Sequence, residues 1–136
     1  MNIIIPIGGL GKRFQSDGYL RPKPLVNVLG KPIIFWVLDS LSLNPSHRLY
    51  IVYHELLDRY NFQDMLRKQY PHTKIRFTTL HSPTRGPLDT ITHFSLEDDS
   101  LPTVSLDCDT FYTQDILQLC ERFSGKNAVF SFHDDQ

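Results

Sequence analysis

This chain of 136 residues has few cysteines, no long apolar run and no excess of charge of one sign. Each of these absences argues against one class of protein. Its two cysteines, Cys108 and Cys120, do not have the spacing of metal ligands, so we expect reduced core thiols and neither a zinc site nor a disulfide framework. The apolar runs fall well short of the ~20 residues of a membrane span. No basic-then-apolar leader precedes Ile3, so we expect a cytoplasmic protein without a membrane span.

The charge balance is nearly even, with 14 Lys and Arg against 15 Asp and Glu. A broad basic surface of the kind that binds nucleic acid is therefore not expected. The length suits one domain, residues 1–136, with a single core, and we find no internal repeat, low-complexity tract or linker. Nothing in the composition decides the oligomeric state, and an oligomer is compatible with it.

Segments typical of strands alternate with segments typical of helices along the whole chain. Strands are predicted over 2–7, 48–54, 74–80, 103–106 and 127–132, and helices over 32–41, 55–69, 88–96 and 113–123. We expect Thr113 to cap the last helix. This alternation predicts a three-layer α/β/α fold around a mostly parallel sheet. The first strand, Asn2–Ile7, is apolar at nearly every position, which is typical of a parallel strand covered on both faces.

The segment after this first strand combines glycines with cations. It reads Gly8-Gly9-Leu10-Gly11-Lys12-Arg13-Phe14, and Arg21-Pro22-Lys23-Pro24-Leu25 follows after a short gap. Ligands of open α/β sheets bind at the carboxyl ends of strands, glycine lets backbone N–H groups approach a phosphate, and cations neutralise its charge. The segment therefore predicts a polyphosphate site, and the alternative is a simple strand-to-helix turn.

Two common phosphate-binding motifs do not fit this segment. A Walker A loop would need a glycine in place of Pro6 and a serine or threonine in place of Arg13. A dinucleotide-binding fingerprint that started at Gly9 would need a small residue in place of Phe14. A phosphate site of another kind is therefore expected.

The segment instead resembles the signature of the sugar-nucleotidyltransferase family, in which Gly-Gly-x-Gly-x-Arg-Phe/Leu precedes Pro-Lys-Pro-Leu. The stretch from Met1 to Leu41 is similar to the subgroup that acts on capsule or cell-surface sugars and related phosphorylated small molecules, although Lys12 stands where the family usually has Ser or Thr. The resemblance implies a Rossmann-like nucleotidyltransferase fold, related to that of glycosyltransferases that use nucleotide sugars. It also implies nucleotide contacts from Gly8, Gly9, Leu10, Gly11, Lys12 and Arg13.

Two carboxylates, Asp107 and Asp109, follow the fourth predicted strand. Side chains two positions apart point to the same side of an extended backbone. One or two carboxylates, completed by substrate phosphate and water, usually hold Mg²⁺, so the pair predicts a magnesium site, with a solvated acidic loop as the alternative. The resemblance implies Asp109 as the metal ligand, and Asp107 as a partner of the metal's ligands or a contact to the ribose.

A third candidate segment, residues 82–90, follows the third predicted strand and contains Gly86. In the resembling family a glycine at this place lies against the nucleotide base, because the missing side chain lets the backbone reach the base edge. Ordinary turn chemistry explains a Pro-Thr-x-Gly-Pro run equally well.

The resemblance implies nucleotidyl transfer as the reaction. A phosphate oxygen of a sugar phosphate or a similar phosphorylated metabolite attacks the α-phosphorus of a nucleoside triphosphate, and pyrophosphate leaves. The implied catalytic residues are Arg13, on the β- and γ-phosphates, and Lys23, between the α-phosphate and the incoming phosphate. The implied cofactor is Mg²⁺, and the implied partners are the nucleoside triphosphate and the phosphorylated acceptor.

Two other functions stay open. An Asp-x-Asp at a strand end also suits a glycosyltransferase that uses nucleotide sugars. Catalytic domains of the resembling family are generally longer, which implies that this domain is incomplete at its C-terminus and leaves a non-catalytic nucleotide-binding fragment as the third hypothesis. Asp134 and Asp135 are candidates for a second metal ligand, and His54, His81 and His93 are interpreted as structural or surface residues.

Overall fold

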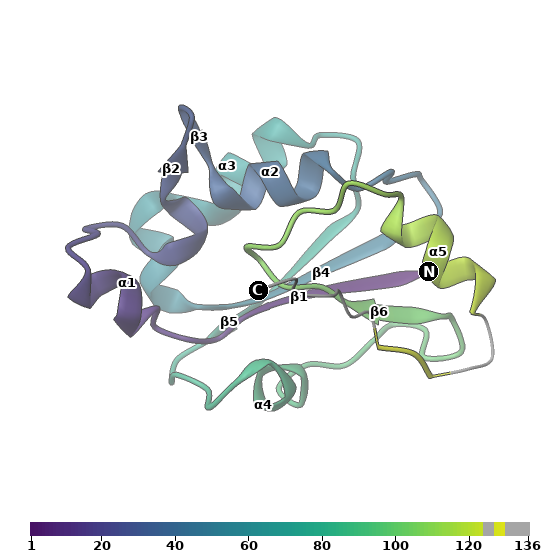
Figure 1. Ribbon diagram of the computed structural model, residues 1–136. Helices are drawn as coiled ribbons and strands as arrows, with labels where there is room; N and C mark the ends of the chain where they lie inside the picture. The colour runs from purple at the N-terminus through teal and green to yellow at the C-terminus, as the bar shows by residue number, and fades with distance from the viewer. Residues whose placement is uncertain (124–126, 130–136) are drawn as a thin grey trace, which may run out of the picture.

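The computed structural model describes residues 1–123 and 127–129. Four strands form one parallel sheet in the order β5-β4-β1-β6, namely β1 (Asn2–Ile7), β4 (Arg48–His54), β5 (Ile75–Leu80) and β6 (Thr103–Ser105). Helices cover both faces, with α4 on one side and α2, α3 and α5 on the other (Figure 1). The predicted α/β class with a mostly parallel sheet is confirmed.

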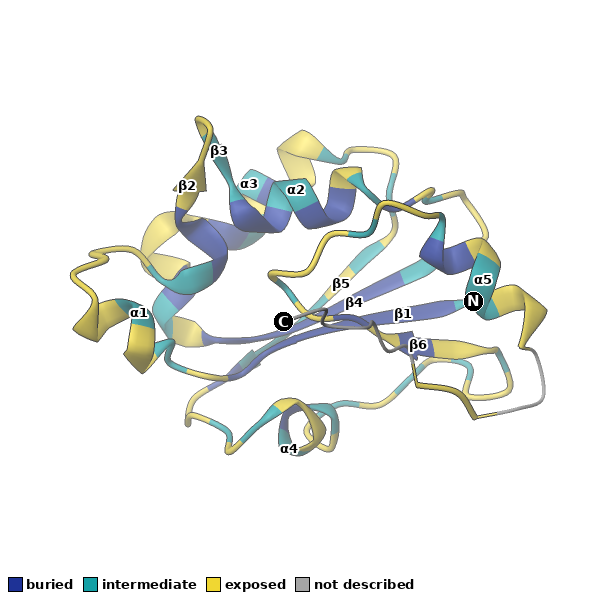
Figure 2. Cartoon of the chain, viewed as in Figure 1, coloured by how far each residue is buried: buried dark blue, intermediate teal, exposed yellow. Residues whose placement is uncertain are grey.

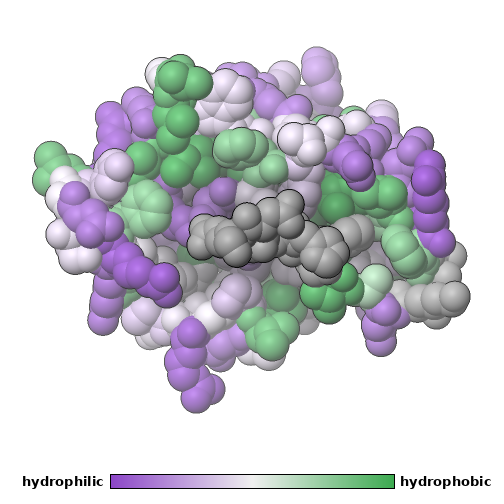
Figure 3. Space-filling model, viewed as in Figure 1, coloured by the Kyte–Doolittle hydropathy of each residue, from purple (hydrophilic) through white to green (hydrophobic). Residues whose placement is uncertain are grey.

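The helices are short, and several serve to turn the chain at an edge of the sheet. Their bounds are α1 (Lys12–Ser16), α2 (Ile33–Asp39), α3 (Phe62–Gln69), α4 (Pro87–Ile91) and α5 (Ile116–Arg122). Two 3₁₀ segments, η1 (Lys23–Leu25) and η2 (Glu55–Tyr60), and a hairpin of β2 (Asn27–Val28) and β3 (Lys31–Pro32) complete the described structure. Figure 3 shows hydrophobic atoms at the projecting hairpin, where Leu29 is 91% exposed.

The core lies between the sheet and the helices α2, α3 and α5. All six residues of β1 are buried, as expected for a strand that is apolar on both faces. Figure 2 shows the buried positions along β1, β4 and the sheet-facing side of α2. The largest fully buried side chains include Tyr53, Phe62, Ile3, Ile5, Ile34 and Leu38.

Four predicted elements differ from the structure, and one of them is the helix expected over 88–96, which ends at Ile91. The helix expected over 55–69 is divided into η2 and α3, because Asn61 between them has a left-handed backbone with φ 52°. The cap of α5 is Asp115, whose carboxylate accepts a hydrogen bond from the Gln118 N–H at 3.0 Å, and not Thr113. The last predicted strand is absent at 127–129; its other residues, like Asp134 and Asp135, lie outside the described part of the chain.

The order of the strands opens a site beside β1. The chain runs outward from β1 to β4 and β5 and then returns to place β6 on the other side of β1. The pairing of β6 with β1 extends only from Asn2 to Ile4, with one further hydrogen bond from the Leu106 N–H to the Ile4 carbonyl at 2.9 Å. Ligands of open α/β sheets bind at such a reversal of strand order.

Candidate active site

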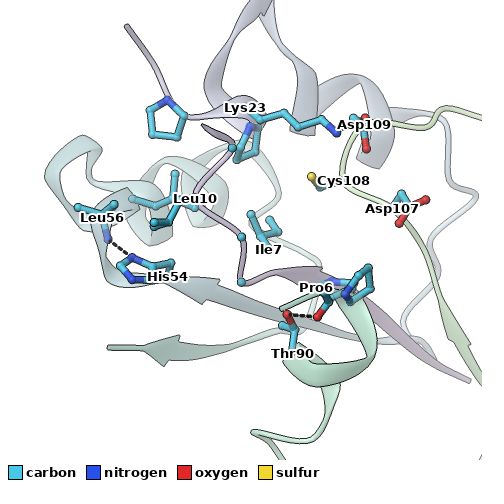
Figure 4. A pocket seen from close by; sticks show the side chains of 18 of the residues that line it. Pro6, Ile7, Leu10, Lys23, His54, Leu56, Thr90, Asp107, Cys108 and Asp109 are labelled. Atoms are coloured by element: carbon cyan, nitrogen blue, oxygen red, sulfur yellow. Dashed lines mark hydrogen bonds and ion pairs between the residues drawn. The ribbon is translucent and has the colours of Figure 1, made fainter. Parts of the chain in front are cut away.

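A cavity of about 460 Å³ lies at the carboxyl ends of β1 and β4 (Figure 4). Its walls come from the segment after β1, η1, the start of α4 and the segment after β6. The predicted site residues that line it are Gly8, Gly9, Leu10, Gly11, Arg13, Lys23, Gly86, Asp107 and Asp109. Lys12 is exposed on α1 and is not among the residues of the wall. The structure thus brings together every predicted site residue except Lys12.

The turn after β1 depends on glycine at two positions. Gly11 begins α1 with a left-handed backbone at φ 61°, a conformation that strains other residues. Gly8 is buried, and a Cβ atom there would lie 2.2 Å from the Thr84 hydroxyl and 2.4 Å from the Thr90 hydroxyl. A side chain at Gly8 therefore requires the segment before α4 to move.

Two threonines join the Gly86 segment to the segment after β1. The Thr84 N–H donates to the Gly8 carbonyl at 3.1 Å. The Thr84 and Thr90 hydroxyls are 2.6 Å apart, and the Thr90 hydroxyl also donates to the Gly86 carbonyl at 3.0 Å. Thr90 is only 1% exposed. These contacts fix the backbone around Gly86 against the end of β1.

Gly86 itself does not need glycine for its backbone. Its φ of 171° is extended, which any residue adopts, and nothing lies within 4 Å of the place where a Cβ atom would stand. Gly86 also lines the cavity. Neither the turn nor the packing at Gly86 accounts for the missing side chain.

The opposite end of the cavity carries the charges. Lys23 begins η1 between two prolines and forms an ion pair with Asp109 on the segment after β6. Both side chains are about a third exposed, at 30% for Lys23 and 35% for Asp109. Figure 4 shows the Lys23 side chain extended across the cavity toward Asp109, with Asp107 farther along the same segment.

Cys108 lies between the two aspartates and packs against the core. Burial, assisted by the neighbouring Asp109 charge, raises the pKa of its thiol to about 12. The thiol therefore stays protonated near neutral pH and is a poor nucleophile. This agrees with the expectation that both cysteines are reduced core residues.

The aspartates fit a metal ion that arrives together with phosphate. Among the described residues no group of three or more His, Cys, Asp or Glu side chains is arranged to hold a metal. Mg²⁺ commonly uses only one or two carboxylates and takes its other ligands from substrate phosphates and water. Asp107 and Asp109 both line the cavity, so carboxylates are present in its wall, but the chain turns at Cys108 and Asp109 and is not extended there as expected.

One further wall of the cavity, formed by the end of β4 and by η2, was not predicted from the sequence. His54 at the end of β4 and Leu56 and Leu57 of η2 line the cavity on the side of Leu10. His54 is 8% exposed, and its Nδ1 accepts a hydrogen bond from the Leu56 N–H at 3.2 Å. A signal for it was present in the sequence, because His54 ends the strand that neighbours β1 and polar residues at such ends meet at the ligand edge.

The sequence profile of the MobA-like NTP transferase domain matches residues 3–136. The chain belongs to this family. Within the described part of this family member, no helix is long and apolar enough to cross a membrane.

Curated relatives match shorter segments. Bifunctional protein GlmU of Bordetella petrii is 46% identical over 55 residues, which cover 40% of this chain and 11% of the relative. Glucose-1-phosphate cytidylyltransferase of Salmonella typhimurium is 36% identical over 44 residues, or 32% of this chain and 17% of the relative.

A solved structure, the nucleoside-diphosphate-sugar pyrophosphorylase of Vibrio cholerae, shares the fold of this family member. It matches with a TM-score of 0.69 and 23% identity over 86% of this chain and 52% of the pyrophosphorylase. The chain thus spans about half of that protein, and far less of the curated relatives.

Proposed function

We propose that this MobA-like domain binds a nucleoside triphosphate in the cavity beside β1 and transfers its nucleotidyl group to a phosphorylated small molecule, a sugar phosphate in the first instance. The observation that carries the proposal is the meeting of Lys23 and Asp109 across one cavity. They come from segments far apart in the sequence and meet where the strand order reverses. Phosphoryl chemistry needs cations and a metal-binding carboxylate at one point, and this ion pair supplies both.

The two ends of the cavity suit the two ends of a nucleotide. Leu10, Leu56 and Leu57 give one end an apolar surface for a flat base, and Gly86 offers backbone polar groups beside it. Lys23 gives the other end positive charge, and Arg13, which also lines the cavity, adds to the positive charge that a triphosphate requires. A nucleotide placed this way has its α-phosphate between the glycine turn and Asp109.

In this arrangement the chain positions the reacting groups and neutralises charge. Arg13 would bind the β- and γ-phosphates and stabilise the departing pyrophosphate. Lys23 would leave Asp109 and bridge the α-phosphate and the incoming phosphate, which holds nucleophile and phosphorus in line. Mg²⁺, held by Asp109 with Asp107 nearby, would supply charge neutralisation at the α-phosphate. No covalent intermediate with the protein is required.

The acceptor is the part of the proposal that rests most on relatives. The names of the Salmonella cytidylyltransferase and the Vibrio pyrophosphorylase point to sugar phosphates and nucleotide sugars. We also propose a role in the synthesis of capsule or cell-surface sugars. The proposed location is the cytoplasm, because nucleoside triphosphates are available in that compartment. The proposal is compatible with an oligomer of this protein.

The test is a screen for pyrophosphate release. The protein is mixed with each nucleoside triphosphate, Mg²⁺, and either a panel of sugar 1-phosphates or phosphocholine. We expect release only when nucleotide, acceptor and Mg²⁺ are all present. Nucleotide binding without release would favour a binding module, and release of a nucleoside diphosphate from a nucleotide sugar would favour a glycosyltransferase.

A further inference from the structure

We infer that His54 is a base-contacting residue that contributes to the choice of nucleotide, through a hydrogen bond donated by its Nε2–H. The inference rests on the proposed function, because it concerns the base end of the same cavity. His54 ends β4, directly beside the end of β1, and lies in the cavity wall close to Leu10 and Leu56 (Figure 4).

The hydrogen bond at Nδ1 assigns the proton of the neutral ring. Nδ1 accepts from the Leu56 N–H at 3.2 Å and caps the start of η2. An acceptor nitrogen carries no proton, so in the neutral imidazole the proton is on Nε2. The backbone of η2 therefore turns the other ring nitrogen into a donor.

That donor has no protein partner in the described part of the chain. The hydrogen bonds and ion pairs there engage His54 only through Nδ1. Among the described residues, the one fully buried side-chain polar atom without a hydrogen-bond partner is Oδ1 of Asn2. Nε2 of His54 also has no partner, so it is not fully buried and retains accessible surface. His54 is 8% exposed and lines the cavity, and the cavity is where the inference places the exposed surface of Nε2.

A donor at the base end recognises an acceptor on the base. Carbonyl oxygens and unprotonated ring nitrogens are the acceptors that nucleobases present on their edges, and their positions differ from base to base. A fixed N–H beside apolar side chains discriminates between bases because a base without an acceptor at that point leaves the donor unpaired and desolvated. His54 thus adds polar selectivity to a wall that Leu10, Leu56 and Leu57 make apolar.

Two substitutions separate this role from the capping role of the same side chain. In His54→Asn, the amide oxygen stands near the position of Nδ1 and still caps η2, but no group reaches as far as Nε2. In His54→Gln, the amide nitrogen reaches the position of Nε2 as a donor, but the cap at Leu56 is lost. If His54 served only to cap η2, His54→Gln would lose more nucleotide affinity than His54→Asn.

The experiment measures the affinity of both variants and the unsubstituted protein for all four nucleoside triphosphates and for inorganic tripolyphosphate, which has no base. We expect His54→Asn to weaken binding of the preferred nucleotide about tenfold and to reduce the differences between the four nucleotides. We expect His54→Gln to stay within about threefold, and both variants to bind tripolyphosphate as the unsubstituted protein does.

Thermal unfolding provides the second measurement. The capping role predicts a lower Tm for His54→Gln than for His54→Asn, whatever happens to the affinities. The inference is overturned if the asparagine variant keeps its nucleotide affinity and preference, or if its tripolyphosphate affinity falls in parallel. If the unsubstituted protein binds no nucleoside triphosphate, the proposed function itself fails. If it does bind one and only the expectations for the His54 variants fail, the inference about His54 is overturned and the proposed function is not.

Discussion

The two ends of the cavity are held in place by different kinds of interaction. At the charged end, Lys23 and Asp109 are partly exposed and contact each other. At the base end, Thr84 and Thr90 fix the Gly86 segment through short hydrogen bonds, and Thr90 is almost wholly buried. The end proposed to bind the base is therefore shaped in the structure without a ligand, whereas in the proposed function the charged end exchanges its internal ion pair for contacts with phosphate.

The exchange at the charged end has a small energetic cost. Ion pairs between solvent-exposed side chains contribute about 0–1 kcal/mol, and this pair is only partly shielded. A triphosphate with its metal ion replaces that contact by several charge-assisted ones, each stronger than a neutral hydrogen bond. The difference between the ends predicts that substitutions at the charged end change turnover and those at the base end change selectivity.

The largest effect is expected at Lys23 and Asp109. We expect Lys23→Ala and Asp109→Asn each to lower the rate of pyrophosphate release about 100- to 1000-fold, the scale seen when a positioned electrostatic contact to a transition state is removed. The Tm should shift by only a few degrees, because the lost ion pair is partly exposed.

Lys31→Ala is the matched control for this pair. Lys31 forms an ion pair with Asp39 at 2.5 Å and has a similarly exposed side chain, at 29%, but it is not among the cavity's lining residues. Its removal should leave pyrophosphate release unchanged. Near-normal turnover in either cavity variant would remove the charged end from the mechanism.

Gly8→Ala is expected to disturb both ends together. The added methyl group meets the Thr84 and Thr90 hydroxyls, and overpacking of this kind costs about 1–3 kcal/mol of unfolding free energy. Affinity for nucleoside triphosphate should fall at least tenfold, because the turn and the Gly86 segment separate. Isothermal titration and thermal unfolding measure the two effects.

Gly9→Ala provides the control for stability at this turn. Nothing lies within 4 Å of the Cβ position of Gly9, so its Tm should change much less than that of Gly8→Ala. Adding Thr84→Ala to Gly8→Ala removes the nearer obstacle and should restore part of the lost stability. An equal loss of Tm at both glycines would contradict the steric explanation.

Arg13 and Lys12 offer a smaller comparison between neighbouring cations. Arg13 lines the cavity and Lys12 does not. We expect Arg13→Ala to weaken binding of tripolyphosphate about tenfold, the loss of a charge-assisted contact, and Lys12→Ala to weaken it threefold or less. Titration at low and high salt measures both, since a long-range charge effect from Lys12 is screened by salt. Equal losses of tripolyphosphate affinity in the two variants would mean that Lys12 contributes to phosphate binding as much as Arg13 does.

The smallest effect is expected at Asp89, under the Gly86 segment. The Arg85 N–H donates to its carboxylate at 2.8 Å, and this hydrogen bond holds the pKa of Asp89 below its usual value of 3.8. A lowered folded-state pKa means that the carboxylate stabilises the fold above pH 3.8 and loses this contribution as the pH falls below it. The Tm difference between the unsubstituted protein and Asp89→Ala should therefore be small near pH 6 and shrink toward pH 3. A difference that grows in acid would contradict this origin.

The parts of the fold that were predicted are those set by local sequence pattern. β1 and β4 have their predicted bounds because continuous apolar runs identify buried strands with little ambiguity. The helix over 55–69 was not predicted correctly because the apolar spacing continues through Asn61, whose left-handed backbone no periodicity reveals. Asp115 replaced Thr113 as the cap because the helix begins at Ile116, three positions later than expected.

The candidate site divides in the same way. Gly8, Gly9, Gly11 and Arg13, which line the cavity, are recognisable because they lie close together directly after β1. His54, Thr84 and Thr90 are isolated residues whose importance comes from their placement beside the segment after β1, and a linear sequence does not display that placement. The surface interpretation of His81 is confirmed, since its side chain is 80% exposed and pairs with Glu55.

The short pairing between β1 and β6 has a consequence for the size of the site. The ladder stops at Ile4, although β1 continues to Ile7, so the two backbones are free to diverge over the last part of β1. In the proposed function the phosphates lie between the segment after β1 and the segment after β6, on the side where this pairing has already ended. A β6 strand longer by one or two residue pairs would hold those two segments together, and the room for phosphate would shrink without any change of side chain.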